Sequence, residues 1–259
     1  MIYHEHVKCE IDGAIATVTI DHAPVNALNI HVMNGLFDCF TAISEDVNLR
    51  AVIITGAGKS FIAGGDITEF LALDTEGVVK STERGYQIYN LIESLPIPTI
   101  AAINGFALGG GLEIVLVSDI CIASEKAKLG LPEVALGITP GYGGTARLAR
   151  RIGIGHAKKM IFTGEHISAE KAKEIGLVQE VVPAGYLMAR AKEIAAKIAS
   201  NGPIPVRISK KALNQSIYVS LEAALETEAE AVNTCFASQD MRDGVAAFLD
   251  KKKPVFNNK

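Results

Sequence analysis

The sequence predicts an α/β protein, because short runs of apolar, β-branched residues alternate with longer segments that carry a helical stripe. Two of these runs, Ala51–Thr55 and Thr99–Ile103, are apolar along nearly their whole length, which is typical of buried strands. Between them lies a helical stripe formed by Tyr86, Tyr89, Ile92 and Leu95. With 259 residues, the chain is long enough to bury one sizeable core.

The first half of the chain contains clear start and stop signals. The alternation of Ile11–Ile20 around Asp12-Gly13 predicts a β-hairpin. Asn29 is a suitable N-cap for the helix that follows. The apolar residues of that helix share one face: Met33, Leu36, Phe37, Phe40 and Ile43. Pro96 and Pro98 end the next helix.

The second half continues the alternation as far as residue 182. Strands are expected at Asp119–Ala123 and Val178–Val182. Pro132 is expected at the first position of a helix, since proline is well suited to that place. Ser168 is expected to cap a short helix that Gly176 ends.

From residue 187 onward the sequence predicts only helices. One apolar stripe runs over Leu187–Ile198 and another over Leu221–Phe236, with Asn201–Pro205 separating them. We therefore expect a core at residues 1–195 and a helical part at residues 196–259. The apolar stripes need a partner, which is either the core or another subunit.

The bulk composition narrows the functional classes. A net charge of −4 argues against a general nucleic-acid binder, so an anionic ligand would need local cations. No apolar run approaches the ~20 residues that a membrane span requires, and residues 1–10 lack the pattern of a signal peptide. The four cysteines are far apart and form no paired metal spacing, which favours a cytoplasmic location without a metal site.

The stretch Asn104–Asp119 places a glycine turn and one acidic residue in an apolar setting. Gly109, Gly110 and Gly111 follow a buried strand and lead into an apolar helix. Glycine lets a backbone approach a ligand closely, and the first N–H groups of a helix have no partner inside it. Glu113 lies three residues after Gly110, on the same helical face. The stretch indicates a site, unless the turn only aids packing and Glu113 pairs with a buried Lys or Arg.

A second glycine turn, Gly64-Gly65-Asp66, exposes another backbone N–H. The amides of Gly65 and Gly110 could therefore converge on one oxygen, polarise a carbonyl and stabilise its enolate, as in an oxyanion hole. Asp66 is interpreted as a helix cap rather than a catalyst. Glu133 adds a second carboxylate, and two carboxylates at one site can divide acid and base roles.

Two nucleotide-binding motifs are excluded by their spacing. Gly56–Ser60 is similar to the end of a P-loop, but position 53 is Ile where that motif needs Gly, and later glycines would break the required helix. Gly109 and Gly111 lack the third glycine of the dinucleotide fingerprint, because position 114 is Ile. The six histidines are scattered, so we expect neither a catalytic triad nor histidine ligands.

Three motifs in this order closely resemble the crotonase (enoyl-CoA hydratase/isomerase) superfamily: Lys59–Ile67, Ile103–Glu113 and Leu131–Arg147. The resemblance runs essentially from end to end and includes Phe248–Lys253. It implies a crotonase-like spiral of repeated β-β-α units with a C-terminal helical trimerisation part, in a homo-oligomer that is a trimer or a dimer of trimers. It also implies an acyl-CoA thioester substrate, with no further cofactor because coenzyme A is part of that substrate.

Within this family the acidic residues distinguish the reactions. Hydratases resemble this chain in carrying both Glu113 and Glu133, whereas isomerases that shift one double bond often keep only the second. Dienoyl-type isomerases carry a further acid at the position of Gly141. The resemblance therefore implies hydration of a trans-2-enoyl-CoA whose thioester oxygen lies between the amides of Gly65 and Gly110. Glu113 would orient and activate the water, and Glu133 would deliver the proton to Cα.

The resemblance also implies which residues bind the substrate: Lys59, Ala63, Asp66, Ile67, Thr68 and Lys251. In related hydratases the lysine that matches Lys251 contacts coenzyme A, sometimes from a neighbouring subunit. The simpler interpretation of the lysine run at residues 251–253 is a solvated helix end.

Three positions depart from the family pattern and leave the acyl group open. Gly65 stands where most hydratases have Ala, Leu131 replaces a common Gln, and Thr68 replaces a frequent Lys. Each is compatible with a cyclic or branched acyl group. Two alternatives remain: another acyl-CoA enzyme of the family, such as an isomerase, dehydratase or hydrolase, and a member that binds acyl-CoA or RNA without catalysis. The two glutamates and the net charge favour the enzyme.

Overall fold

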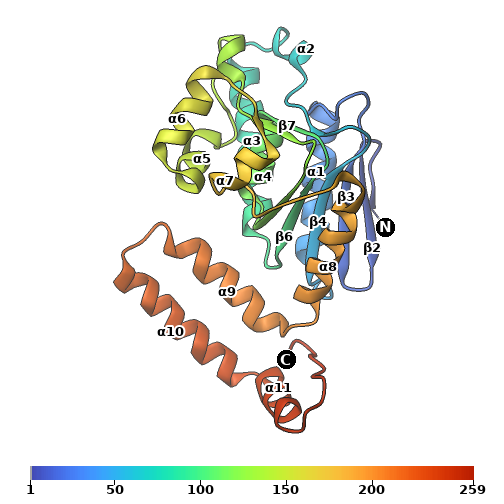
Figure 1. The fold of residues 1–259 in the computed structure, drawn as a ribbon, viewed down its shortest axis with the longest axis vertical. Coiled ribbons are helices and arrows are strands. Elements are labelled where there is room, and N and C mark those ends of the chain that lie inside the picture. The colour runs from blue at the N-terminus through green and yellow to red at the C-terminus, as the bar shows by residue number, and fades with distance from the viewer. Residues whose placement is uncertain (1) are drawn as a thin grey trace.

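The computed structural model describes residues 2–259 and consists of an α/β core from which an arm of helices extends (Figure 1). In spatial order the seven-stranded sheet of the core contains β1 (Ile2–Tyr3), β2 (Val7–Asp12), β3 (Ile15–Ile20), β4 (Ala51–Gly56), β6 (Thr99–Ile103), β8 (Ile120–Ser124) and β11 (Glu180–Val182). The four-stranded sheet contains β10 (Ile167–Ser168), β9 (Lys128–Gly130), β7 (Phe106–Leu108) and β5 (Ser60–Ile62). The predicted α/β class is confirmed.

The first elements form where the sequence predicts them. β2 and β3 make an antiparallel hairpin, and Gly13 in its turn adopts a φ of 58°. Asn29 caps helix α1 (Ile30–Glu45) by accepting a hydrogen bond of 2.9 Å from the N–H of Val32. The predicted apolar stripe faces the core, where its buried members are Met33, Leu36, Phe40 and Ile43.

The middle of the chain consists of successive β-β-α repeats. The first strand of each repeat is β4, β6 or β8, and it lies parallel to its neighbours in the seven-stranded sheet, called the large sheet below. The second strand is β5, β7 or β9, and it belongs to the four-stranded sheet, called the small sheet. The first two repeats end in α3 (Thr75–Ser94) and α4 (Gly110–Val117). The third leads through the 3₁₀ helix η1 (Glu133–Leu136) to α5 (Gly144–Ile152). This is the spiral that the resemblance implied.

Two asparagine side chains hold the chain where it passes from the large sheet to the small one. Nδ2 of Asn26 donates to the carbonyl oxygens of Ala57 (2.9 Å) and Ser60 (2.8 Å). Nδ2 of Asn104 donates to the carbonyl oxygens of Gly58 (3.1 Å) and Ser60 (3.0 Å). Because these carbonyl groups lie at the crossover from β4 to β5, the side-chain amides satisfy them in place of a neighbouring strand.

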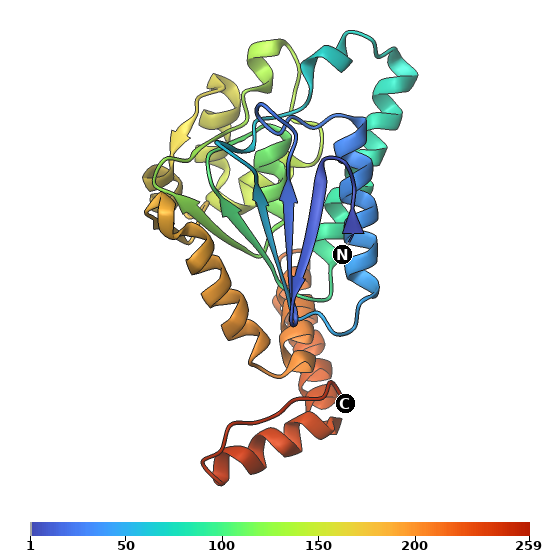
Figure 2. The same cartoon turned by 90° about the vertical axis from the view of Figure 1, so that its right-hand side faces the viewer.

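The large sheet is covered on both faces, which explains its continuously apolar strands. On β4, Val52 and Ile54 belong to the main core with α1, α3 and α4, whereas Ala51 and Ile53 face α8 (Leu187–Ala199). Figure 2 shows α1 in blue and α8 in orange on opposite sides of the strands. The residues that α8 buries against the sheet are Leu187, Ala191 and Ala195.

Beyond α8 the chain leaves the core as the arm. It consists of α9 (Pro203–Ser216), α10 (Leu221–Ala237) and α11 (Gln239–Leu249). The sequence predicts only a separator at Asn201–Pro205, but the structure begins α9 at Pro203, the position where a missing N–H costs no hydrogen bond. The expected boundary after residue 195 falls inside α8, which packs on the core.

The remaining helices are short and surround the core: α2 (Ile67–Phe70), α6 (Ile154–Thr163), α7 (Ala169–Glu174) and the 3₁₀ helix η2 (Ala184–Tyr186). Ser168 caps α7 as predicted, and Gly176 lies just beyond its end with a φ of 79°. The prediction for Pro132 is wrong by one residue. Its carbonyl oxygen accepts a hydrogen bond of 2.9 Å from the N–H of Ala135, so Pro132 caps η1 and the helix begins at Glu133.

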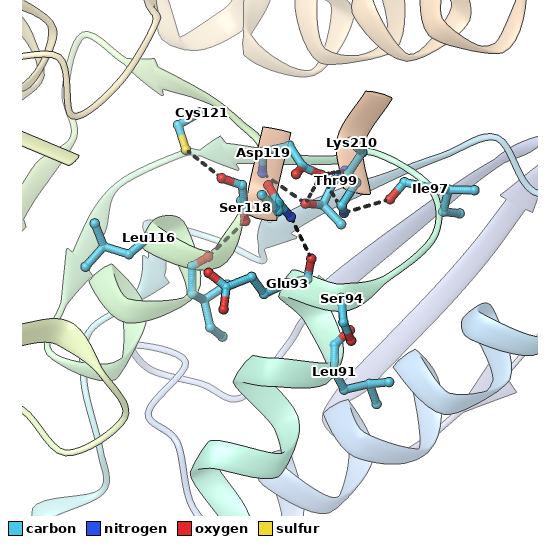
Figure 3. Close-up of polar contacts among 12 residues, drawn as sticks. Leu91, Glu93, Ser94, Ile97, Thr99, Leu116, Ser118, Asp119, Cys121 and Lys210 are labelled. Carbon is cyan, nitrogen blue, oxygen red and sulfur yellow. Dashed lines mark hydrogen bonds and ion pairs between the residues drawn. The ribbon is translucent and has the colours of Figure 1, made fainter. Parts of the chain in front are cut away.

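A buried ion pair attaches the arm to the core (Figure 3). Nζ of Lys210, on α9, lies 2.7 Å from Oδ2 of Asp119 and donates to the carbonyl oxygen of Ile97 at 3.0 Å. The same carboxylate oxygen accepts hydrogen bonds from the backbone N–H (2.7 Å) and the hydroxyl (3.0 Å) of Thr99. The Lys210 side chain is 7% exposed, so burial lowers its pKa and Asp119 opposes that shift. Asp119 thus joins α9 to the start of β6.

We predict that Lys210→Met lowers the free energy of unfolding by about 2–4 kcal/mol, because Asp119 would keep a largely buried charge without its cation. Urea unfolding at one fixed protein concentration measures this change. The double variant Lys210→Met/Asp119→Asn removes both charges and should recover part of the loss. Equal instability of the single and double variants would contradict the ion-pair explanation.

Candidate active site

Three turns that carry the expected site residues lie side by side, because they follow three adjacent parallel strands. β5, β7 and β9 are neighbours in the small sheet and run parallel to one another. Residues 63–65 follow β5, residues 109–110 follow β7, and residues 131–133 follow β9. The carboxyl ends of parallel strands meet at one edge of a sheet, where ligands of α/β proteins commonly bind. The fold therefore brings together residues from three consecutive repeats.

The two glycine amides expected as donors have no partner in the part of the chain that the structure describes. Gly65 forms a parallel bridge with Leu28, in which the N–H of Leu28 donates to Gly64 and the N–H of Asp66 donates to Leu28, each at 2.9 Å. This pattern directs the N–H of Gly65 away from Leu28. Within residues 2–259, neither this N–H nor that of Gly110 donates a hydrogen bond. Both amides are therefore available to a ligand.

Glycine is required in the turn after β7 by the backbone conformation of Gly109 and by the close packing of Gly111. Gly109 adopts a φ of 52°, which turns the chain from β7 into α4. A β-carbon on Gly109 would lie 3.6 Å from Cα of Gly64 and 3.2 Å from Oε1 of Glu133. A β-carbon on Gly111 would lie 2.1 Å from the carbonyl oxygen of Ile62, so any side chain there would push α4 away from β5.

Gly65 has a local reason to replace the alanine expected from the family pattern. A β-carbon at this position would lie 2.8 Å from Cζ of Phe70, the last residue of α2. The aromatic ring therefore occupies the space that an alanine methyl group would need, and alanine at this position would require the exposed Phe70 side chain to move aside.

Glu113 lies in the first turn of α4, and 1% of its surface is exposed. Its Oε1 atom accepts hydrogen bonds from the backbone N–H groups of Tyr142 (2.8 Å) and Gly144 (2.7 Å). Two amides, rather than the Lys or Arg that the sequence left open, thus hold the carboxylate. Amide donors favour the ionised form without neutralising its charge.

The environment of Glu113 moves its pKa into the neutral range. Burial raises the pKa of this carboxyl to about 7. The two backbone N–H groups oppose the shift because they favour the ionised form, whereas the nearby charge of Glu133 adds to it. A carboxyl group with a pKa near 7 can take up or release a proton at neutral pH, as acid–base catalysis requires.

Glu133, the first residue of η1, is half-buried beside the glycine turn. Burial raises the pKa of its carboxyl, while a backbone hydrogen bond lowers it. Its Oε2 atom is inaccessible to solvent and has no hydrogen-bond partner among the described residues. A buried polar atom without a partner is unfavourable and commonly marks a functional position. Glu133 is therefore a candidate for contact with a ligand.

The site also uses groups that the sequence analysis did not identify. The segment Pro140–Gly144 lies in the third motif, but no residue type reveals that its backbone N–H groups bind Glu113. The ring of Tyr142 packs on that of Tyr89, with 5.1 Å between the ring centroids. Nη1 of Arg147 donates to the carbonyl oxygen of Tyr142 at 2.9 Å and steadies this segment.

The other residues expected to bind the substrate lie at different distances from the glycine turns. Four lie on the segment from the end of β5 into α2, which contains Gly65: Ala63, Asp66, Ile67 and Thr68. Asp66 caps α2 as predicted, because its Oδ1 atom accepts a hydrogen bond of 3.0 Å from the N–H of Thr68. Lys59 precedes β5 and thus lies at the opposite end of that strand from Gly65. Lys251 follows α11, at the far end of the molecule from α2 (Figure 1).

Other kinds of site were sought in residues 2–259. No group of His, Cys, Asp and Glu side chains there is placed to hold a metal ion. No helix in the same range is both long and apolar enough to cross a membrane. A cleft of about 1090 Å³ lies between α9 and the core, but neither Glu113 nor Glu133 lines it.

Comparison with known proteins identifies the family. The model of the enoyl-CoA hydratase/isomerase family matches residues 10–259. The chain belongs to this family. It is 46% identical over 250 residues to the short-chain-enoyl-CoA hydratase of Clostridium acetobutylicum, with 96% of each protein covered. It is 42% identical over 258 residues to the crotonyl-CoA hydratase of Syntrophomonas wolfei, with 99% of each covered.

The enoyl-CoA hydratase/isomerase fold is equally clear from solved structures. The crystal structure of an enoyl-CoA hydratase from Bacillus anthracis superimposes with a TM-score of 0.96 at 41% identity, covering 98% of this chain and 100% of that one. Family and fold class are thus confirmed as the three motifs predicted them.

We predict that Glu113→Gln stabilises the protein at pH 8. In the unfolded chain this carboxyl loses its proton near the ordinary value of 4.5, whereas the folded protein retains the proton up to about pH 7. The folded state therefore binds more protons between these values, and the free energy of unfolding falls by up to about 3 kcal/mol as the pH rises through them. Glutamine does not titrate and avoids this loss.

Urea unfolding at two pH values measures the effect. The variant should gain about 1–3 kcal/mol at pH 8 and about 1 kcal/mol or less at pH 5. Glu83→Gln, on the exposed surface of α3, serves as the matched control and should show no such difference. A gain that is equal at both pH values would show that ionisation of Glu113 is not its cause.

Proposed function

We propose that this protein is an enoyl-CoA hydratase, which adds water reversibly across the 2,3 double bond of a trans-2-enoyl-CoA to give a 3-hydroxyacyl-CoA. One observation carries the proposal: the carboxyl groups of Glu113 (buried) and Glu133 (half-buried) lie on the segments that follow β7 and β9, and the amides of Gly65 and Gly110, just after β5 and β7, have no partner among residues 2–259. The similarity to a short-chain-enoyl-CoA hydratase and a crotonyl-CoA hydratase supports a short acyl chain.

In this proposal the N–H groups of Gly65 and Gly110 form an oxyanion hole for the thioester oxygen. As the oxygen of water bonds to Cβ, the electron pair of the double bond moves toward the carbonyl, and negative charge develops on the thioester oxygen. Loss of one such donor typically costs ~2.7–4 kcal/mol of transition-state stabilisation. Because both amides are fixed at strand ends, they need little rearrangement when the charge forms.

The hydrogen bonds of the two glutamates support different roles. Oε1 of Glu113 accepts two N–H donors, which favour its ionised form, so we assign it as the base that orients the water and takes its proton. Oε2 of Glu133 has no donor within the described chain, which favours its protonated form, so we assign it as the acid that protonates Cα. Burial, with the charge of Glu133 adding to it, raises the pKa of Glu113, so the pair tends to hold one proton near neutral pH.

The balance of the reaction follows from these assignments. One O–H bond of the water breaks, its hydroxyl bonds to Cβ, and its proton goes to Glu113. The proton of Glu133 goes to Cα as the enolate collapses to the thioester. One proton then returns from Glu113 to Glu133, and the starting state is restored.

Coenzyme A enters this proposal as part of the substrate, and local cations bind its phosphates. Lys59 is the candidate on the core and Lys251 the candidate in the arm. Because Lys251 follows α11, far from the glycine turns of its own chain, it would contact coenzyme A on a neighbouring subunit (Figure 1). The loop that contains residues 63–68 would line the pocket. The four cysteines are free thiols, which suits the expected cytoplasmic location.

We further propose that the protein is a homo-oligomer, either a trimer or a dimer of trimers. α10 buries none of its residues within the chain. The arm leaves large apolar side chains mostly exposed: Leu213, Leu221, Leu225, Phe236, Phe248 and Leu249. Extended apolar surfaces of this kind mark interaction sites. Residues 196–259 would then be the oligomerisation part, and residues 1–195 the core with the active site.

We predict that Glu113→Gln and Glu133→Gln each lower kcat for crotonyl-CoA hydration by about 10²–10⁴-fold, because each removes a proton-transfer group. The loss of the enoyl absorbance measures the rate, and titration with the saturated butyryl-CoA should show nearly unchanged binding. For the wild type, kcat/KM should fall as the pH drops below about 7, because Glu113 then takes up a proton. Residual activity of Glu113→Gln should lack this decrease.

The exposed variant Glu83→Gln is the control and should keep the wild-type rate. Full activity of either catalytic-site variant would remove the mechanism. A wild type that moves the double bond of a 3-enoyl-CoA but does not hydrate crotonyl-CoA would be an isomerase instead.

Light scattering is expected to give a native mass of three or six chains of 27.5 kDa each. The physical reason is the uncovered apolar surface of the arm, which a partner subunit would bury. A monomeric mass across the micromolar range would refute the proposed assembly.

A further inference from the structure

The proposed oxyanion hole requires a rigid amide within a run of three glycines, Gly109–Gly111. Gly109, Gly110 and Gly111 have no side chains, so steric repulsion restricts their dihedral angles little. A catalytic donor must nevertheless be held within about 0.5 Å of its working position. The rigidity of this turn must therefore come from contacts with the rest of the protein.

The ends of the turn are fixed by the backbone. The N–H of Gly109 donates to the carbonyl oxygen of Gly130 on β9, and the N–H of Glu113 donates to that of Gly109, each at 3.0 Å. Gly111 packs against the backbone of Ile62 on β5. The bond from Glu113 also holds the peptide plane that carries the N–H of Gly110, but none of these contacts reaches the carbonyl group of Gly110.

The residue that holds Gly110 is Tyr89, on α3 of the preceding repeat. Its hydroxyl donates a hydrogen bond of 2.8 Å to the carbonyl oxygen of Gly110, and none of its surface is exposed. A β-carbon on Gly110 would lie 3.1 Å from the hydroxyl oxygen and 2.7 Å from Cδ1 of Leu28. Gly110 thus packs directly against the phenol group of Tyr89 and against the side chain of Leu28.

We propose that Tyr89 is a positioning residue for hydration, whose hydroxyl holds Gly110 so that the N–H of Gly110 points at the thioester oxygen. Glu113 holds the carbonyl of Gly109, which shares a peptide plane with the N–H of Gly110, and Tyr89 holds the next peptide unit, so the two bonds together fix the backbone on both sides of the Cα of Gly110. This inference rests on the proposed function.

Tyr89 also contacts the segment that holds the catalytic base. Its ring packs on Tyr142, whose backbone N–H donates to Oε1 of Glu113. One buried side chain therefore supports both the amide and the carboxylate of the site. Burial, with the charges of Glu113 and Glu133 adding to it, raises the pKa of Tyr89 well above its ordinary value. The hydroxyl consequently stays protonated and remains a donor at working pH.

The experiment compares Tyr89→Phe with the wild type in crotonyl-CoA hydration. Removing the hydroxyl should lower kcat about tenfold, which is the effect of losing roughly one hydrogen bond's worth of transition-state stabilisation, and should change KM much less. Infrared spectroscopy of bound butyryl-CoA, labelled with ¹³C at the thioester carbonyl, provides the direct readout. Binding to the wild type should lower the carbonyl stretching frequency, and the variant should lose much of this shift.

Three further variants separate positioning from general stability. Tyr186→Phe removes a surface hydroxyl that bonds to Glu193 and should keep both kcat and the spectral shift. Ile43→Val weakens the buried core beneath α1, far in sequence from the site, and should lower Tm without changing either readout. Replacement of Tyr89 by 4-aminophenylalanine keeps a donor at the same place and should restore both.

The outcomes are distinguishable from failure of the proposed function. The inference is overturned if Tyr89→Phe keeps the wild-type kcat and carbonyl shift, if kcat falls while the shift is unchanged, or if Ile43→Val gives the same losses. A wild type that binds butyryl-CoA but does not hydrate crotonyl-CoA would instead count against the proposed function.

Discussion

The parallel pairing of β5, β7 and β9 is the constraint on which the site depends. Each strand has only three residues, yet the turns after them supply both amides and both carboxyl groups. A slip of one residue would move an amide by about 3.3 Å, more than a hydrogen bond tolerates. The pairing is tight because glycines allow it: a β-carbon on Gly105 would lie 1.8 Å from the carbonyl oxygen of Lys59. Close backbone packing at Gly105 thus helps to fix how these strands pair.

The arrangement of these strands also buries the carboxyl groups of Glu113 and Glu133, in surroundings that disfavour their charged forms. Glu113 lies in an apolar helix with only two amides to compensate its charge, and Oε2 of Glu133 has no partner within residues 2–259. The ion pair of Lys210 with Asp119 shows the contrasting solution, because there a buried cation meets a carboxylate that is also hydrogen-bonded. The two glutamates lower the stability of the fold but can exchange protons. The Lys210–Asp119 pair instead attaches the arm to the core.

The sequence alone determined the features that depend on neighbouring residues. Asn29, Asp66 and Ser168 cap helices because their side chains reach N–H groups two or three residues ahead. The strands β4 and β6 follow from local apolar runs, since their burial on both faces leaves no alternation. The glycine turns and the two acidic residues could be identified from the sequence because they too are local features. The resemblance of the three motifs then predicted the family and its spiral fold.

Only the tertiary structure decided which distant groups meet. The small sheet was not predicted, because strands of three residues are too short to show a period, and α9 was missed because its first turn contains two prolines. The partners of Glu113 are backbone amides about thirty residues away, and every residue type carries such an amide. Tyr89 was predicted only as one member of a helical stripe. The carbonyl oxygen of Gly110, to which its hydroxyl donates a hydrogen bond, belongs to the next repeat. Sequence patterns record local periodicity and side-chain chemistry, whereas contacts of this kind arise only when the repeats pack together.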